Sequence, residues 1–350
     1  MAKRKLAIVC NSPNPDLQAY FRNSIDYVSS SLDLLILKNR HISVNARGAD
    51  ARNISYGKKA FGSLWFFYEV IIAFVVFFRC FSNWHVIHFT TAAVANLPLS
   101  FLLKIKGAKQ IYTIHDVKPH PGLKSKFIDL YNRLIIGFLA DEILLHSQGS
   151  SQYLKAYSKT IRTSHIPLGG FDMIRPAHEN SDYFLFFGRF DQYKGLENII
   201  KIARACPEEQ FVVAGKGSSP YLEGLKALPN VRLINRFIED SEIPGLFAGA
   251  RATLLPYTSA TQSGVVVLSY AHGIPVIVTD VGCLSEYVSE QTGHVHVKID
   301  GIIELILSKT PEYWQSMRSK VIQTYEDEFS RQALENKYIN FYTDRMGLRD

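Results

Sequence analysis

Two cations lie close together in the second half of the chain, at the start of one predicted helix. Arg189 follows an apolar run that ends at Gly188, and Lys194 comes just before the next predicted helix. A helix N-terminus offers free N–H groups and the positive end of a dipole to phosphate. A guanidinium fork and an ammonium would add charge at the same place. The segment therefore predicts a diphosphate site, with surface ion pairs to Asp191 or Glu197 as the structural alternative.

Similar loops follow two neighbouring predicted strands. Lys216 comes after the apolar run 211–215, and Ser263 and Gly264 open a helix after the run 252–256. Glycine lets a phosphate approach the backbone closely. An ordinary serine N-cap is the alternative for this turn.

Histidines end two predicted strands of the first half. His88 and His115 occupy such strand ends, Asp116 follows His115, and Asn11 opens the loop after the first strand. We expect His115 to face a cleft and the others to lie on its acceptor side, whereas a histidine that lines the core or caps a loop is the alternative. No further ligand set stands at a metal-binding spacing, so we expect no metal site.

Apolar strands alternate with helices along the whole chain, which predicts α/β domains with parallel, helix-covered sheets. The length of 350 residues suits two domains, and we place them at 1–170 and 171–350, joined by Gly169, Gly170 and the polar stretch 175–182. Helices predicted over 312–326 and 330–346 end the chain, and the last one would pack back on the first domain. The strands are expected at 5–11, 32–38, 85–90, 110–115, 142–147, 163–168, 183–188, 211–215, 231–235, 252–256 and 275–279.

The net charge of +7 is unevenly distributed, with +12 in residues 1–170 and −5 in residues 171–350. The first half therefore faces an anionic partner, such as nucleic acid, a lipid surface or a phosphorylated acceptor, with a basic face that is merely solvated as the alternative. No recognisable nucleic-acid module accompanies the basic residues, so we expect no nucleic-acid partner. Scattered cysteines and an N-terminal apolar run too short for export predict a cytoplasmic chain.

The segment 61–81 is apolar with basic flanks at Lys58, Lys59 and Arg79. It is shorter than the roughly 20 residues that a bilayer span requires. A buried crossover helix and a helix lying on a membrane surface both remain open, and the second would make the protein peripheral at the inner membrane face.

The order of these motifs resembles the donor half of retaining glycosyltransferases of the GT-B fold, family 4, over most of residues 183–295. The resemblance rests on Gly188-Arg189 with Lys194-Gly195, the Ser263-Gly264 turn, and the runs 273–280 and 281–286. It implies two Rossmann-like domains with a C-terminal helix crossing back to the first domain. It also implies that Arg189 and Lys194 bind the diphosphate and stabilise its departure, and that the Ser263-Gly264 turn touches the distal phosphate.

In the first half, the resemblance implies that His115 contacts the sugar near the reacting centre. One departure concerns a pair of glutamates that usually contacts the transferred sugar and the ribose. Thr261 and Ser269 occupy these positions here, which leaves Gln262 or Glu286 as substitutes.

The resemblance implies an enzyme that moves a sugar from a UDP- or GDP-linked donor to a glycan or lipid-linked acceptor in surface polysaccharide synthesis. No cofactor or metal is expected beyond the nucleotide sugar. A sugar-nucleotide epimerase or hydrolase of the same fold is the alternative enzyme, and a drifted protein that only binds nucleotide sugars is the non-enzymatic one.

Overall fold

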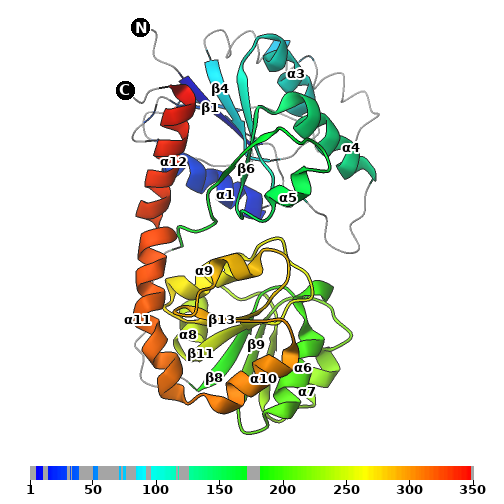
Figure 1. Ribbon diagram of the computed structural model, residues 1–350, viewed down its shortest axis with the longest axis vertical. Helices are drawn as coiled ribbons and strands as arrows, with labels where there is room; N and C mark the ends of the chain where they lie inside the picture. The colour runs from blue at the N-terminus through cyan, green and yellow to red at the C-terminus, as the bar shows by residue number, and fades with distance from the viewer. Residues whose placement is uncertain are drawn as a thin grey trace.

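The structure is a computed structural model that describes residues 5–10, 15–29, 32, 34–38, 50–53, 71, 74–75, 84–91, 96–115, 117, 126–171 and 182–347. The described strands form two sheets, stacked one above the other in Figure 1, and every described strand pair is parallel. The predicted architecture of two helix-covered parallel sheets is confirmed.

The first sheet is covered on both faces. Alternate residues of its central strand β1 point to opposite sides, so Ala7 and Val9 join one apolar cluster while Leu6 and Ile8 join another. In order across the sheet the strands are β3 (Asp50–Asn53), β2 (Leu34–Lys38), β1 (Lys5–Cys10), β4 (Trp84–Phe89), β5 (Lys109–Thr113), β6 (Glu142–Leu145) and β7 (Arg162–His165). The helices that follow the strands are α1 (Pro15–Asp26), α3 (Leu97–Ile105), α4 (Lys126–Leu134) with its continuation η2 (Ile135–Leu139), and α5 (Ser151–Leu154).

The second sheet reverses its strand order between β8 and β11. In order the strands are β10 (Val231–Asn235), β9 (Gln210–Gly215), β8 (Tyr183–Phe187), β11 (Ala250–Leu255), β12 (Val276–Thr279) and β13 (Gly293–His296). The loops after β8 and β11 therefore diverge, and such a switch point is where ligands bind in open parallel sheets. The connecting elements are η3 (Gln192–Lys194), α6 (Leu196–Ala205), α7 (Leu222–Lys226), α8 (Ile243–Ala248), α9 (Gly264–Ala271), η4 (Leu284–Tyr287) and α10 (Ile299–Ser308).

Two C-terminal helices join the domains along one side (Figure 1). Helix α11 (Pro311–Glu328) packs on the second domain, and α12 (Arg331–Met346) places Leu334, Tyr338 and Tyr342 in the apolar cluster beneath β1. The predicted return of the last helix to the first domain is confirmed. Beside this crossing, Gly170 N–H donates to the Phe329 carbonyl at 2.8 Å, so the linker and the α11–α12 junction cross between the domains together.

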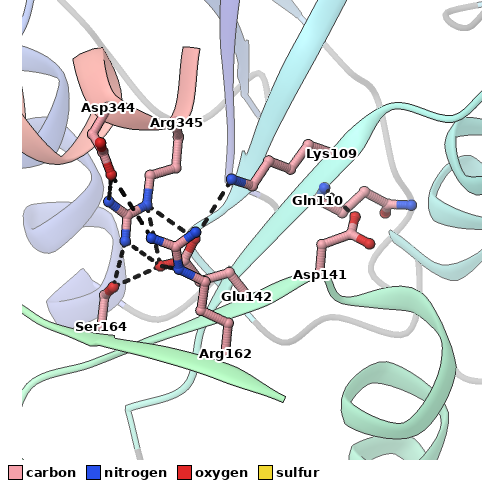
Figure 2. A network of polar contacts seen from close by, with 8 residues as sticks. All are labelled: Lys109, Gln110, Asp141, Glu142, Arg162, Ser164, Asp344 and Arg345. Atoms are coloured by element: carbon pink, nitrogen blue, oxygen red, sulfur yellow. Dashed lines mark hydrogen bonds and ion pairs between the residues drawn. The ribbon is translucent and has the colours of Figure 1, made fainter. Parts of the chain in front are cut away.

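A buried ion pair fixes the end of α12 to the first sheet (Figure 2). The Glu142 side chain in β6 is 0% exposed, and Arg345 of α12 donates to both of its oxygens, at 2.6 and 3.0 Å. Ser164 of the neighbouring strand β7 donates to the same carboxylate at 2.6 Å. Burial alone would raise the pKa of Glu142, but the hydrogen bonds from Arg345 and Ser164 and the nearby guanidinium charges outweigh it and hold the pKa below its usual value.

Several sequence expectations fail on weakly patterned segments. The sequence did not predict the short polar edge strand β3 or the helix α10. Nearly all of the segment 61–81 lies outside the described residues. No helix among the described residues has the length and apolarity needed to cross a membrane. The boundary at residue 170 stays a prediction.

We predict that Arg345→Met lowers the free energy of unfolding by about 3–5 kcal/mol, because it leaves the buried Glu142 carboxylate without its main partner. Since the pKa of Glu142 is lowered in the folded state, this contribution is present at neutral pH and fades as the pH falls below about 4. Urea unfolding at neutral pH and at a pH below about 4 measures this contribution to the free energy of unfolding. Arg331→Met on the same helix is the control, because Arg331 is exposed and its Nη2 lies 4.0 Å from Asp26, and we expect a change within about 0.5 kcal/mol. Equal effects of the two substitutions would contradict the prediction.

Candidate active site

The loops after β8 and β11 are joined to each other at the switch point. Thr258 N–H donates to the Tyr193 carbonyl at 2.9 Å, and the Asn198 amide donates to the Pro256 carbonyl at 2.8 Å. Gly195 has a φ of 73°, and a Cβ at this position would collide with the Pro256 carbonyl. Glycine is therefore required here for two reasons, and the close approach sets where the adjacent Lys194 lies.

Lys194 is a buried cation with no counter-ion among the described residues. Its residue is 9% exposed, and its Nζ lies 4.0 Å from the centre of the Tyr257 ring and 5.2 Å from that of Tyr193. No carboxylate within the described part of the chain pairs with this ammonium. Cation–π contacts stabilise a desolvated ammonium by about 2 kcal/mol, less than the several kcal/mol that burying an ion costs. The site is thus electrostatically incomplete and favours an anion.

Arg189 and the start of α9 stand on either side of the same cleft. The Arg189 side chain is 72% exposed and is held by a single surface contact, from its Nε to Asp191 at 3.4 Å. Such an exposed pair is weak, so the guanidinium can exchange it for a phosphate. Ser263 is the N-cap residue of α9, and its side chain makes no capping bond to the first backbone N–H groups. These N–H groups remain for a ligand.

A cleft of about 490 Å³ brings most of these groups together. This volume is in the range of small-molecule sites. No aspartate or glutamate is among the described residues that line it, so Arg189 and Lys194 give this lining a positive potential. The lining residues are Tyr20, Asn23, Tyr27, Pro167, Leu168, Gly169, Phe171, Gly188, Arg189, Lys194, Gln262, Ser263, Gly264, Val265, Leu268, Leu334 and Tyr338.

Thr261 and Ser269 stand at the two positions where the resemblance would place glutamates, and their surroundings differ. Thr261 is buried, and its carbonyl accepts a hydrogen bond from Ser147 of the first domain at 3.4 Å. Ser269 is fully buried, shares a 2.7 Å hydrogen bond with Thr253, and donates to the Ile274 carbonyl at 2.9 Å. The Ser269 hydroxyl is thus occupied inside the domain and does not line the cleft. Gln262 does line it, and its Oε1 is buried without a hydrogen-bond partner.

Glu286 is used between the domains instead of in the cleft. Its carboxylate accepts the backbone N–H groups of Gln148 and Gly149 at 2.7 and 2.6 Å. A Cβ on Gly149 would collide with this carboxylate, so glycine admits the contact. In the structure Glu286 therefore ties the two domains together, although we had expected it to contact the donor. Lys216, a further expected donor residue, has an exposed side chain and is not among the residues that line the cleft.

Histidines cluster at the ends of β5 and β6. His115 is half-buried against Tyr20, with its Nδ1 3.2 Å from His146 Nε2 and its Nε2 3.1 Å from the Thr90 carbonyl. His88 is fully buried between Tyr342 and Thr113, with contacts of 2.5 and 2.7 Å at its two ring nitrogens. Burial and the nearby charge of His115 lower the pKa of His88 to about 3. His88 would have to move to touch an acceptor, while Asn11 and Asp116 lie outside the described residues.

Sequence reasoning missed the tyrosines of the cleft and His146. Tyr20 and Asn23 lie on one face of α1 and Tyr27 directly follows the helix, and this spacing of three and four residues is the signal that could have identified them. Tyr20 also links the cleft to α12, the helix that crosses between the domains, because its hydroxyl lies 2.8 Å from the Tyr338 hydroxyl. His146 ends its strand as His115 does, and this shared position was its only sequence signal.

The comparisons with known proteins agree with this geometry. Residues 181–308 match the family model "Glycosyl transferases group 1". The matched segment, less than half of the chain, is similar to the group 1 glycosyltransferases. It contains the loops after β8 and β11, and with them Arg189, Lys194 and the start of α9. A protein of Klebsiella pneumoniae described as an "Uncharacterized 41.2 kDa protein in cps region" is 25% identical over 164 residues. The match covers 45% of this chain and 45% of that protein, so it spans less than half of the relative's length.

Two solved structures show that the whole chain has the GT-B fold. Sucrose-phosphate synthase from Thermosynechococcus elongatus is 15% identical, with a TM-score of 0.78 over 99% of this chain and 100% of that one. The Anabaena protein Alr3699/HepE in complex with UDP-glucose is also 15% identical, with a TM-score of 0.73 over 97% and 99%. The fold expected from the resemblance is confirmed.

We predict that Lys194→Met weakens binding of inorganic pyrophosphate at least tenfold without lowering the stability of the ligand-free protein. The substitution removes an uncompensated buried cation and keeps an apolar stem between the tyrosine rings. Calorimetry measures the affinity, and urea unfolding measures the stability. Lys201→Met on the exposed side of α6 is the matched control and should leave both unchanged. Unchanged affinity, or a loss of more than about 1 kcal/mol in stability, would contradict the assignment.

Proposed function

We propose that the protein transfers a sugar from a nucleoside diphosphate sugar to a glycan or lipid-linked acceptor, with retention of configuration, in surface polysaccharide synthesis. One observation carries the proposal: Lys194 is a buried cation with no counter-ion among the described residues, at the switch point of a segment that is similar to the group 1 glycosyltransferases. A diphosphate would supply the missing negative charge. The donor thus binds the second domain, and the acceptor binds the basic first one.

The positive charges that bind the diphosphate would also stabilise the transition state of the transfer. As the bond between sugar and phosphate breaks, negative charge grows on the departing diphosphate, and donors preorganised around it stabilise that charge most in the transition state. Lys194, Arg189 and the first N–H groups of α9 would surround it. Because no carboxylate of the described residues lines the cleft, the departing phosphate oxygen takes the acceptor proton, and attack occurs on the face from which the diphosphate leaves. These fixed cations fill the role of a divalent metal, so the reaction proceeds without one.

Gln262 is our candidate for contact with the transferred sugar. Its Oε1 is buried at the cleft and unpartnered, and a buried acceptor without a hydrogen bond costs about 1–3 kcal/mol. A hydroxyl of the donor sugar would satisfy it. The buried Ser269 cannot replace a ribose-binding carboxylate without rearrangement, so we propose that the ribose is held by backbone groups instead.

The comparisons support the substrate classes. The Anabaena structure contains UDP-glucose, which favours a UDP-linked donor here. The Klebsiella relative is described by its place in a cps region, which favours a polysaccharide acceptor.

The experiment is a screen of UDP-, GDP- and ADP-sugars by thermal shift, followed by transfer assays with the donor that stabilises most. We expect transfer to a lipid-linked or free glycan acceptor, unchanged by EDTA. Free or epimerised sugar formed without an acceptor would favour the hydrolase or epimerase instead. Donor binding with no turnover on any acceptor would leave a binding protein, and loss of transfer in EDTA would overturn the metal-free mechanism.

We predict that His115→Ala lowers transfer at least 10²-fold while the affinity for the nucleoside diphosphate stays within a few-fold. His115 stands on the first domain beside Tyr20, away from the diphosphate groups of the second domain, so its contribution is made chiefly in the transition state. Calorimetry with the nucleoside diphosphate and a transfer assay test it together. Unchanged transfer would reduce His115 to a structural residue, and lost nucleotide affinity would move it to the donor site.

An apolar surface with basic neighbours is our candidate for attachment to an anionic membrane. Phe101 and Ile105 on α3 and Phe138 on η2 are exposed, at 46%, 84% and 76%. Lys104 and Lys106 lie beside them in a half of the chain that carries +12. Apolar side chains would enter the headgroup region while each cation near the surface contributes about 1 kcal/mol.

We predict that Ile105→Asp with Phe138→Asp reduces recovery of the protein with anionic vesicles at least fivefold in a flotation assay at low salt. The paired control is Phe237→Asp, since Phe237 is 62% exposed on the second domain, and it should float like the native protein. Equal recovery with neutral vesicles, or an equal loss for the control, would count against this surface.

A further inference from the structure

His146 ends β6 next to the strand that carries His115 toward the cleft. It is 4% exposed, its Nδ1 lies 2.9 Å from the Ile166 carbonyl, and its Nε2 lies 3.2 Å from His115 Nδ1. The neighbouring strands β5 and β6 are paired in parallel, which brings the two strand ends together. His146 is too deeply buried to meet a substrate directly, so any effect on the reaction must pass through His115.

The positions of the protons follow from the partners of each nitrogen. A backbone carbonyl only accepts, so His146 Nδ1 must carry the proton that it donates to Ile166. Burial, followed by the nearby charge of His115, lowers the pKa of His146 to about 3, so the ring is neutral near pH 7. A neutral ring with a proton on Nδ1 has a bare lone pair on Nε2. That lone pair faces His115 Nδ1, which must therefore be the donor.

The remaining nitrogen of His115 faces a different partner. Its Nε2 lies 3.1 Å from the Thr90 carbonyl, which can accept a proton but cannot donate one. By the same rule, Nε2 must carry a proton to make this bond, so the ring that makes both hydrogen bonds is the imidazolium, and loss of the Nε2 proton leaves a lone pair facing the carbonyl oxygen. The ring can thus become positive while its orientation stays fixed. Tyr20 of α1 packs edge-on against both rings, at 4.7 and 5.0 Å between ring centres, and restricts rotation further.

We propose that His146 is a positioning residue that holds the proton on His115 Nδ1 and fixes the ring, so that His115 changes charge only at Nε2. This rests on the proposed glycosyl transfer, in which we assign His115 a contribution made chiefly in the transition state. Other titratable groups near His115 differ in kind. His88, which is bonded to Tyr342 and Thr113, is buried and neutral, and Tyr20 shares its hydroxyl with Thr113 and Tyr338.

Two substitutions separate the two bonds of His146. In His146→Asn the short amide can still donate to Ile166 but does not reach His115. In His146→Gln the longer amide can accept from His115 Nδ1. If His146 positions His115, the His146→Asn variant should show a kcat roughly 10- to 100-fold lower and an unchanged KM for the donor, because it loses an orienting partner. The kcat of the His146→Gln variant should stay within a few-fold of the native value. If His146 is merely structural, Asn should be the better substitute or the two should be equal, and that result would overturn the proposal.

His272→Asn is the matched control. His272 is a buried histidine of the second domain whose Nδ1 bonds to the Leu268 carbonyl at 2.9 Å, as His146 bonds to Ile166, and whose Nε2 has no partner. Its substitution should leave kcat unchanged, which accounts for the general effect of replacing a buried imidazole. Melting temperatures of all three variants show whether any has lost its fold.

Nitrogen-15 NMR of histidine-labelled native protein tests the proton positions without any substrate. We expect His115 to be protonated on Nδ1 throughout, with Nε2 changing state as the pH is lowered, and in His146→Asn we expect a mixture of tautomers. A native His115 with its proton on Nε2 alone would overturn the proposal. Because this measurement needs no turnover, it stands or falls independently of the glycosyl transfer itself.

Discussion

The cleft depends on a carboxylate that is buried in β6, beside the edge strand of the first sheet, and neutralised by a helix from the C-terminal end of the chain. Glu142 lies on β6 with no exposed surface, and Arg345 reaches it from the last turn of α12. Without α12 this carboxylate would keep, among cations, only the longer contacts with Arg162 and Lys109, at 3.6 and 3.9 Å, so the first sheet is more stable when α12 lies across it. The second domain must then stand where α11 places it. The linker is held at the same crossing, because the Gly170 N–H donates to the Phe329 carbonyl.

A second tie holds the opposite part of the interface. The Glu286 carboxylate accepts two backbone N–H groups of the first domain, and charge-assisted bonds of this kind are stronger than neutral ones. The Tyr287 hydroxyl also donates to the His146 carbonyl beside it. The domains are thus connected on both sides of the cleft, and any opening motion must break the Glu286 contacts or bend the paired crossing at Gly170.

The sequence predicted those parts of the fold and site that depend on neighbours along the chain. The buried strands of the second domain were recognisable because each is an apolar run ended by glycine or proline, and Arg189 and Lys194 because they stand close together. The remaining features depend on contacts between distant residues. The hydrogen bond between Tyr20 and Tyr338 joins positions 318 residues apart, and Glu286 binds backbone N–H groups, which no residue type reveals. A serine in an apolar helix likewise does not show whether it faces a cleft, and Ser269 turned out to be internal.

The use of Glu286 between the domains also explains the charge of the cleft. If that carboxylate faced the donor, it would offset part of the positive potential of Arg189 and Lys194 and compete with the diphosphate for them. With Glu286 bonded elsewhere and Thr261 and Ser269 in place of acidic residues, the described lining contains cations and neutral groups only. The loss of the two expected glutamates and the burial of an unpaired lysine therefore act in the same direction. Both leave the cleft dependent on its ligand for negative charge, so recognition of the diphosphate should outweigh recognition of the ribose in donor binding.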